Sequence, residues 1–351
     1  MSLLPLQDQR NITFWDIVAE GVPRKKGIRY AKPLTIEKLF IELQKFRVKN
    51  FSNSECIHEF KSKGISVELR GITFDSSSVS VLLQIMDEKA SRQVFRNRTT
   101  RRSRIAEKHD DEVVEYSMHI VISKTAYANR KDSYQCVIEE CPVCSALTAV
   151  HALNMLLKKA AFKFEKKFLR PHPDGQVIQG KPEMMKTYNR LSLLGHPAES
   201  LNDTIREGTL TNLVAVTKFD ADLTIDGTDT CIPVAKHLKF SVSNELVGDN
   251  VSYYEKIKNF AFQNNCEVLK IQFKDKDGSP YTLDMNTETG QLVDERKFIK
   301  RLVLDGHTKE FFTSSMDCFD LELLQNMKRA LYGSISTKVG QHISPTLADV
   351  S

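Results

Sequence analysis

The 351-residue chain lacks the features that mark membrane-spanning and secreted proteins. No apolar run approaches the roughly 18 to 20 residues that a spanning helix needs. The N-terminal residues MSLLPLQDQRN contain neither a basic leader nor an adequate apolar stretch, so we expect no secretory signal. The seven cysteines, an odd number scattered from Cys56 to Cys318, do not resemble a disulfide framework. These absences predict a cytoplasmic protein.

Sequence motifs of common enzyme classes are absent as well. The chain has no P-loop, no G-x-G-x-x-G or G-x-S-x-G fingerprint and no H-E-x-x-H pair. Its nine histidines are dispersed and form no recognisable triad. We therefore expect no cofactor and name no catalytic or metal-binding residue. The absences favour a binding protein over an enzyme.

The sequence concentrates positive charge in one short segment. The formal net charge is only +5, yet residues 89–108, KASRQVFRNRTTRRSRIAEK, carry eight basic side chains and a single acid, Glu107. Six of the eight are arginines, whose planar guanidinium suits paired hydrogen bonds to phosphate oxygens. Such a segment predicts a surface for DNA or RNA, although a solvated helix face or a basic loop has the same composition. The predicted contacts are Arg92, Arg96, Arg98, Arg101, Arg102, Arg104 and Lys108.

A second basic set follows on a predicted helix. Residues 142–170 have an apolar stripe at helical spacing and a proline in the first turn, which predicts one long helix near 143–170. Its phenylalanines are expected to pack rather than to stack on bases. Its distal half supplies an auxiliary set of nucleic-acid contacts: Lys158, Lys159, Lys163, Lys166 and Lys167.

The length predicts a two-domain α/β (α+β) protein with mixed or antiparallel sheets and packed helices. We expect an N-terminal α/β domain over 1–175 that contains the basic insertion, itself helical or a helix plus a mobile loop because it has no Gly or Pro. A linker or helical connection over 176–200, with a helix over 184–194, leads to a β-rich domain over 201–351 that ends in a helix near 319–332. Hydrophobic periodicity further predicts helices at 34–50 and 251–264, and strands at 65–69, 79–86, 116–123, 213–218, 221–225, 266–273 and 281–285.

Two enzyme-like constellations compete with the binding interpretation. Cys136, Cys141, Cys144 and His151 include one C-x-x-C, but a zinc site of the usual kind needs a second pair, and ordinary buried cysteines explain them better. Glu59-Phe60-Lys61 supplies the E-x-K fragment of metal-dependent nucleases, for which Asp75 is an available second carboxylate. A nuclease therefore remains an alternative, as does an adaptor whose basic segment binds an acidic protein.

Six further segments follow one another along the chain: VSVLLQIM before the basic run, DDEVVEYSMHIVISKTAYAN and ALTAVHALNMLL after it, and later LTNLVAVTKFDADLTIDG, YYEKIKNFAF and EVLKIQFKDKDGSPYTLDMNTETGQL. In the order and character of these segments, the chain resembles the Rex A-like phage-exclusion proteins. The resemblance implies a homodimeric, largely sequence-independent DNA-binding protein, the cytoplasmic sensor of an antiphage exclusion or abortive-infection system that signals to a separate membrane effector. It agrees with the charge pattern, which points to phosphate contacts.

Overall fold

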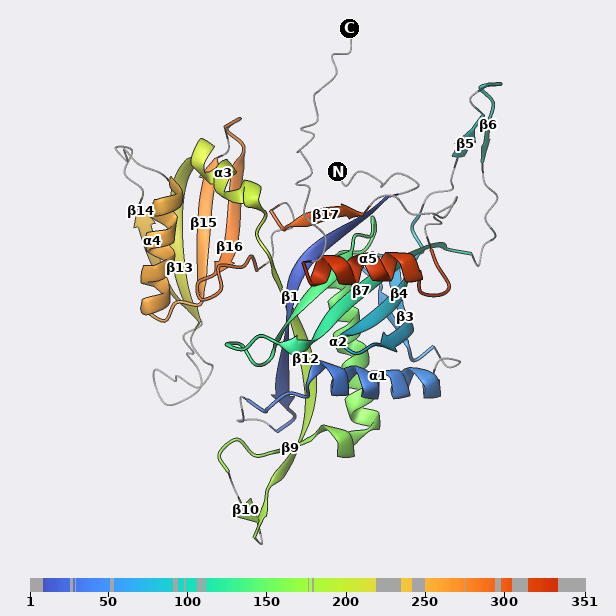
Figure 1. Cartoon of the computed structure of the whole chain (residues 1–351), viewed down its shortest axis with the longest axis horizontal. Helices are drawn as coiled ribbons and strands as arrows, with labels where there is room; N and C mark the ends of the chain where they lie inside the picture. Colours follow the sequence, from blue (N-terminus) through green and yellow to red (C-terminus); the bar gives the residue numbers. More distant parts are fainter. Residues whose placement is uncertain are drawn as a thin grey trace. The chain divides into compact units, whose positions relative to one another are not determined.

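The computed structural model describes residues 9–25, 28, 30–50, 54–90, 94–97, 99–105, 109, 112–175, 177–178, 180–218, 235–241, 250–274, 276–293, 298–304 and 315–333. The chain forms two compact units (Figure 1). The first comprises Met1–Thr13, Ile17–Leu193 and Leu302–Ser351, and the second Phe14–Asp16 and Leu194–Arg301. Both combine antiparallel strands with helices, which confirms the α+β class.

The first unit is built on a large sheet with the strand order β2-β3-β4-β7-β8-β1-β12-β9, and β17 pairs with β1. The helices of the unit are α1 (Ile36–Asn50), α2 (Ala146–Lys163), the 3-10 helix η2 (Glu165–Phe168) and α5 (Leu321–Leu331). Its strands are β1 (Arg10–Pro23), β2 (Ile57–Phe60), β3 (Ile65–Phe74), β4 (Ser78–Asp87), β7 (Val114–Ala126), β8 (Ser133–Glu139), β9 (Leu169–Pro171), β12 (Met184–Gly195) and β17 (Arg301–Leu304), with two separate hairpins, β5 (Val94–Arg96) with β6 (Ser103–Ile105) and β10 (Val177–Ile178) with β11 (Lys181–Pro182).

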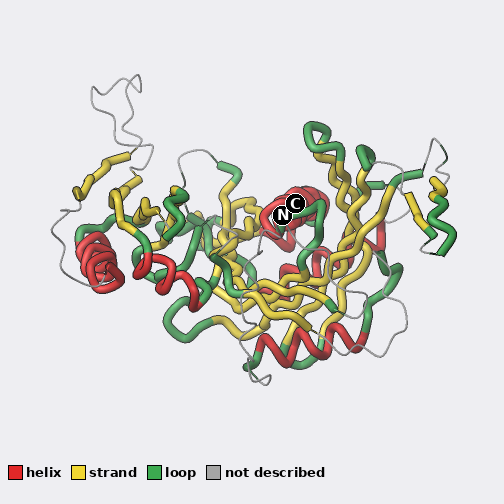
Figure 2. Tube along the Cα trace, turned by 90° about the horizontal axis from the view of Figure 1, so that it is seen from above, coloured by secondary structure: helices red, strands yellow, loops and turns green. Residues whose placement is uncertain are grey.

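The two faces of this sheet differ in chemistry. Helices α1 and α2 contact β2, β3 and β4, whereas α5 contacts β7 and β8, so helices cover both faces (Figure 2). Strand alternation turns Val81, Leu83 and Ile120 toward α1 and α2, where they are fully buried. The alternate residues Gln84 and His119 face the C-terminal segment and are buried too. One face is therefore an apolar core, and the other holds buried polar groups that need partners.

A buried ionic network supplies partners on the polar face. The carboxylate of Glu139 accepts hydrogen bonds from the backbone N–H of His119 (3.0 Å) and from its Nδ1 (2.7 Å), and it pairs with Arg10 Nε at 3.1 Å. Burial lowers the pKa of the Arg10 guanidinium, while the carboxylates of Glu139 and Asp320 act in the opposite direction. His119 Nε2 accepts from the Asp320 N–H (3.4 Å), and the Asp320 side chain caps α5 by accepting from the N–H of Leu323.

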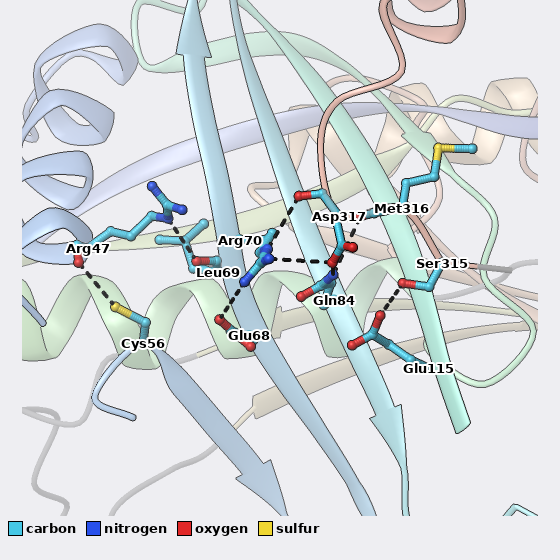
Figure 3. A network of polar contacts seen from close by, with 10 residues as sticks. All are labelled: Arg47, Cys56, Glu68, Leu69, Arg70, Gln84, Glu115, Ser315, Met316 and Asp317. Carbon is cyan, nitrogen blue, oxygen red and sulfur yellow. Dashed lines mark hydrogen bonds and ion pairs between the residues drawn. The ribbon is translucent and has the colours of Figure 1, made fainter. Parts of the chain in front are cut away.

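The segment 315–333, which we call the C-terminal strap, lies along this polar face (Figure 3). Asp317 accepts from Arg70 Nη2 (3.4 Å) and Gln84 Nε2 (3.3 Å), and the Ser315 hydroxyl donates to Glu115. The terminal helix thus belongs to the first unit, so its expected place in a domain over 201–351 is wrong. Within this helix Leu323 is buried, whereas Leu321 is 79% exposed.

The second unit is a four-stranded antiparallel sheet in the order β14-β13-β15-β16. Helices α3 and α4 pack on β13. The elements are α3 (Glu199–Glu207), β13 (Thr209–Lys218), β14 (Ala235–Ser241), α4 (Asn250–Gln263), β15 (Val268–Lys274) and β16 (Pro280–Asn286). Asp16 from β1 is buried here and accepts from His196 Nε2 (2.7 Å) and Gln291 Nε2 (2.5 Å). The strand expected at 221–225 lies outside the described residues.

The element predicted at residues 184–194 has the wrong type. Residues 184–194, expected to be a helix within a linker or helical connection over 176–200, form strand β12, in which buried and exposed positions alternate. Thr187 and Asn189 occupy buried positions of that strand. Because polar residues sit where a half-buried strand normally shows apolar ones, the period of two is hidden in the sequence.

Removing the carboxylate of Glu139 should strongly destabilise the first unit. Glu139→Ala removes the carboxylate that forms the ion pair with the buried Arg10 guanidinium, which costs about 3–5 kcal/mol of unfolding free energy. Urea denaturation followed by circular dichroism measures the loss. The control Glu59→Ala removes an exposed carboxylate and should change stability by about 0.5 kcal/mol or less. Equal stabilities of the two variants would contradict the role of the network.

Acid should weaken the docking of the strap at Asp75. Burial would raise the pKa of this carboxyl, but the ammonium of Lys328 (2.5 Å), the Ser78 hydroxyl and the backbone N–H groups of Ser77 and Ser78 hold it well below its usual value. A lowered pKa stabilises the fold fully above the unfolded value of about 3.9, and this stabilisation declines progressively as the pH falls from there toward the lowered pKa of the folded state. Because this ion pair is half-exposed, Asp75→Asn should lower the free energy of unfolding by about 1 kcal/mol at pH 6. The difference in unfolding free energy between the variant and the parent protein should shrink below about pH 4. A difference that does not vary with pH would contradict this.

Candidate nucleic-acid interface

The basic segment forms a two-stranded hairpin. Strands β5 and β6 pair antiparallel, with Arg96 opposite Ser103. The helix expected within 89–108 is therefore wrong for its described residues. The physical reason is local, because valine, phenylalanine and isoleucine favour extended backbone, and Asn97 favours a turn between them.

Side-chain hydrogen bonds fix the hairpin tip. Asn97 Oδ1 accepts from the backbone N–H of Thr99 (2.9 Å) and Thr100 (2.8 Å), and the N–H of Asn97 donates to the carbonyl of Arg102 (2.9 Å). Arg101 has a φ of +56°, in the left-handed region that a non-glycine residue adopts only rarely. These hydrogen bonds close the turn that precedes Arg101 and Arg102.

The arginines of the hairpin reach solvent. Arg96, Arg101, Arg102 and Arg104 are all exposed. Because Arg104 adjoins Ser103, the partner of Arg96, the side chains of Arg96 and Arg104 leave opposite faces of the ribbon. The remaining predicted contacts of this segment, Arg92, Arg98 and Lys108, lie outside the described residues.

Both ends of the basic segment start from one place on the sheet. Asp87 at the end of β4 pairs with Val114 at the start of β7, so the chain leaves and returns there. Lys89 donates to the carbonyl of Ser62 (3.1 Å), beside the turn that carries exposed Lys61 and Lys63. The pairing of β3 with β4 brings this turn next to Lys89 at the start of the basic segment, a proximity that residue spacing in the sequence does not reveal. Glu88, next to Lys89, is also exposed, so acidic and basic side chains are mixed where the segment leaves the sheet. The part with arginines alone is the hairpin itself.

The auxiliary lysines form no continuous surface with the root of the hairpin. Lys63, near that root, donates to Thr148 Oγ1 in the first turn of α2 (2.8 Å), whereas Lys163 ends α2 about 22 Å further along its axis. The helix is shorter than the expected 143–170 and is followed by η2 and β9. Lys159 donates to two backbone carbonyls, and Lys163 pairs with Glu55 at 3.2 Å. Lys158, Lys166 and Lys167 are exposed.

The nuclease constellation is not assembled. Glu59 in β2 pairs with Ser66 near the start of β3, and Asp75 follows the end of that strand. Nine residues at about 3.4 Å each place the two carboxylates about 30 Å apart. Asp75 moreover forms an ion pair with Lys328 and accepts a hydrogen bond from the backbone N–H of Ser78. Asp75 is therefore too far away to act as the second carboxylate of a metal site at Glu59.

The cysteine cluster also lacks the geometry of a metal or redox site. Within the described residues, no group of three His, Cys, Asp or Glu side chains is placed to hold a metal ion. Cys136 and Cys144 are buried, and His151 lies instead beside the ring of His58, at 5.7 Å between centroids. Burial raises the pKa of the Cys141 thiol to about 11, so little reactive thiolate forms at neutral pH.

Comparisons with protein-family models, with curated proteins and with solved structures gave no match. In the part of the chain that the structure describes, no helix is long and apolar enough to cross a membrane. The geometry of the hairpin is therefore the main support for a functional assignment.

Proposed function

We propose that this protein binds DNA through the arginine hairpin, by contacts to the phosphate backbone that depend little on sequence. The observation that carries the proposal is the presence of four exposed arginines on one hairpin whose tip is closed by hydrogen bonds to Asn97. Guanidinium groups bind phosphate oxygens in a bidentate manner. The carboxylates of the described residues form no ion pair with Arg96, Arg101 or Arg102, so these groups need not exchange an internal partner for a phosphate.

The contrast with buried and paired cations supports the choice of this surface. Arg10, Lys159 and Lys163 serve the fold through carboxylate and carbonyl partners. We therefore assign the principal contacts to the hairpin and a secondary contribution to Lys158, Lys166 and Lys167.

The resemblance to Rex A-like proteins extends the proposal. In this extended proposal, the protein is a cytoplasmic homodimer that senses DNA or protein–DNA complexes in antiphage defence and signals to a separate membrane effector. The scatter of an odd number of cysteines supports the cytoplasmic location. The proposed DNA contact does not depend on this extension, because it rests on the hairpin.

Neutralising the hairpin should weaken DNA binding and its salt dependence together. Each phosphate contact contributes about −0.9 to the slope of log K against log salt. Replacing Arg101, Arg102 and Arg104 by Ala should therefore make the slope shallower by two to three units, measured by fluorescence anisotropy with a duplex at several salt concentrations.

The control for this variant carries the same change in charge. Lys131→Ala, Lys181→Ala and Lys276→Ala remove three exposed, scattered lysines and should leave the slope within about one unit. An unchanged slope and affinity in the arginine variant would remove the hairpin from the binding site. Binding of an acidic protein but of no nucleic acid would instead favour the adaptor function.

A further inference from the structure

The shape of the hairpin selects among the forms of nucleic acid. We infer that it enters the major groove of duplex B-form DNA tip first, an inference that rests on the proposed DNA binding and adds to it the kind of substrate. Paired strands lie about 4.8 Å apart, and with side chains on both sides the ribbon is about 10 Å across. The major groove of B-DNA is about 12 Å wide, whereas the minor groove is about 6 Å wide. The ribbon fits the former and is too broad for the latter.

The length of the ribbon agrees with the depth of that groove. Three paired residues per strand span about 10 Å, and the groove is about 8.5 Å deep. In this position Arg101 and Arg102 at the tip lie inside the groove, where their charges neutralise phosphates and displace condensed counterions without reading a sequence. Arg96 and Arg104, on opposite faces of the ribbon, reach the phosphates of the two walls.

Duplex RNA offers no equivalent site. The major groove of A-form RNA is deep and too narrow for side chains to read, and a single strand has no groove. The hairpin should thus bind a DNA duplex at least tenfold more tightly than an RNA duplex or single-stranded DNA of the same sequence. Equal affinities for the two duplexes would overturn the inference, and the proposed phosphate binding would stand.

Groove footprinting tests the inference directly on the full-length protein. Dimethyl sulfate methylates guanine N7 in the major groove and adenine N3 in the minor groove. Saturating protein should protect guanine N7 and leave adenine N3 reactive, and the minor-groove ligand netropsin should change affinity less than twofold. Protection of adenine N3, or displacement by netropsin, would place the ribbon in the minor groove and overturn the inference. Absence of binding to every nucleic acid would instead overturn the proposed function itself.

A neutral substitution separates shape from charge. Asn97→Ala removes the side-chain acceptor of two tip hydrogen bonds and leaves every arginine in place. A loosened tip must be ordered on binding, so affinity should fall about three- to tenfold while the salt slope stays constant. Thr99→Ala, which retains its backbone N–H, is the matched control and should bind like the parent protein. Equal affinity of Asn97→Ala and the parent would show that tip shape plays no part and would overturn the inference.

Discussion

The antiparallel ladder between β4 and β7 is the interaction on which the first unit depends. It runs in register from Ser78 opposite Ser123 to Asp87 opposite Val114. At its Asp87 end it brings together the two ends of the basic segment. Next to its Ser78 end lies the Asp75 turn, which receives Lys328 and Tyr332 of the C-terminal strap. A shift of one residue in the register between β4 and β7 would turn the apolar side chains to the polar face. It would also separate the two ends of the basic segment and displace the Asp75 turn from the strap.

The positive charges of this protein lie in two physically distinct environments, buried and exposed. Arg10 is buried, so it requires the carboxylate of Glu139, and breaking that pair is costly. The hairpin arginines are hydrated, and repulsion among them is weak in water and screened by salt. A polyanion that displaces this hydration gains several charge-assisted hydrogen bonds at once. Exposure of these four guanidinium groups is thus the physical basis of the proposed phosphate binding.

The polar face of the sheet explains why the C-terminal strap belongs to the first unit. Gln84, Arg70 and His119 would lack these partners without Asp317 and Asp320, which lie more than 200 residues away in the chain. Gly71 contributes space, because a Cβ there would approach the ring of Phe319 to 2.8 Å. Such long-range satisfaction of buried polar groups leaves no local pattern, and a boundary drawn from sequence order placed the final helix with the wrong unit.

Sequence alone determined the elements whose periodicity is local. The spacing of Leu39, Leu43 and Phe46 fixed α1, the apolar run from Val79 fixed β4, and the arginine density identified the candidate surface. Tertiary structure decided that the basic segment contains a hairpin, that β12 is a strand despite its buried polar positions, and that Glu59 and Asp75 lie far apart. The physical reason is that composition and period act within a few residues, whereas register, burial and the pairing of distant charges are set only when the sheet closes.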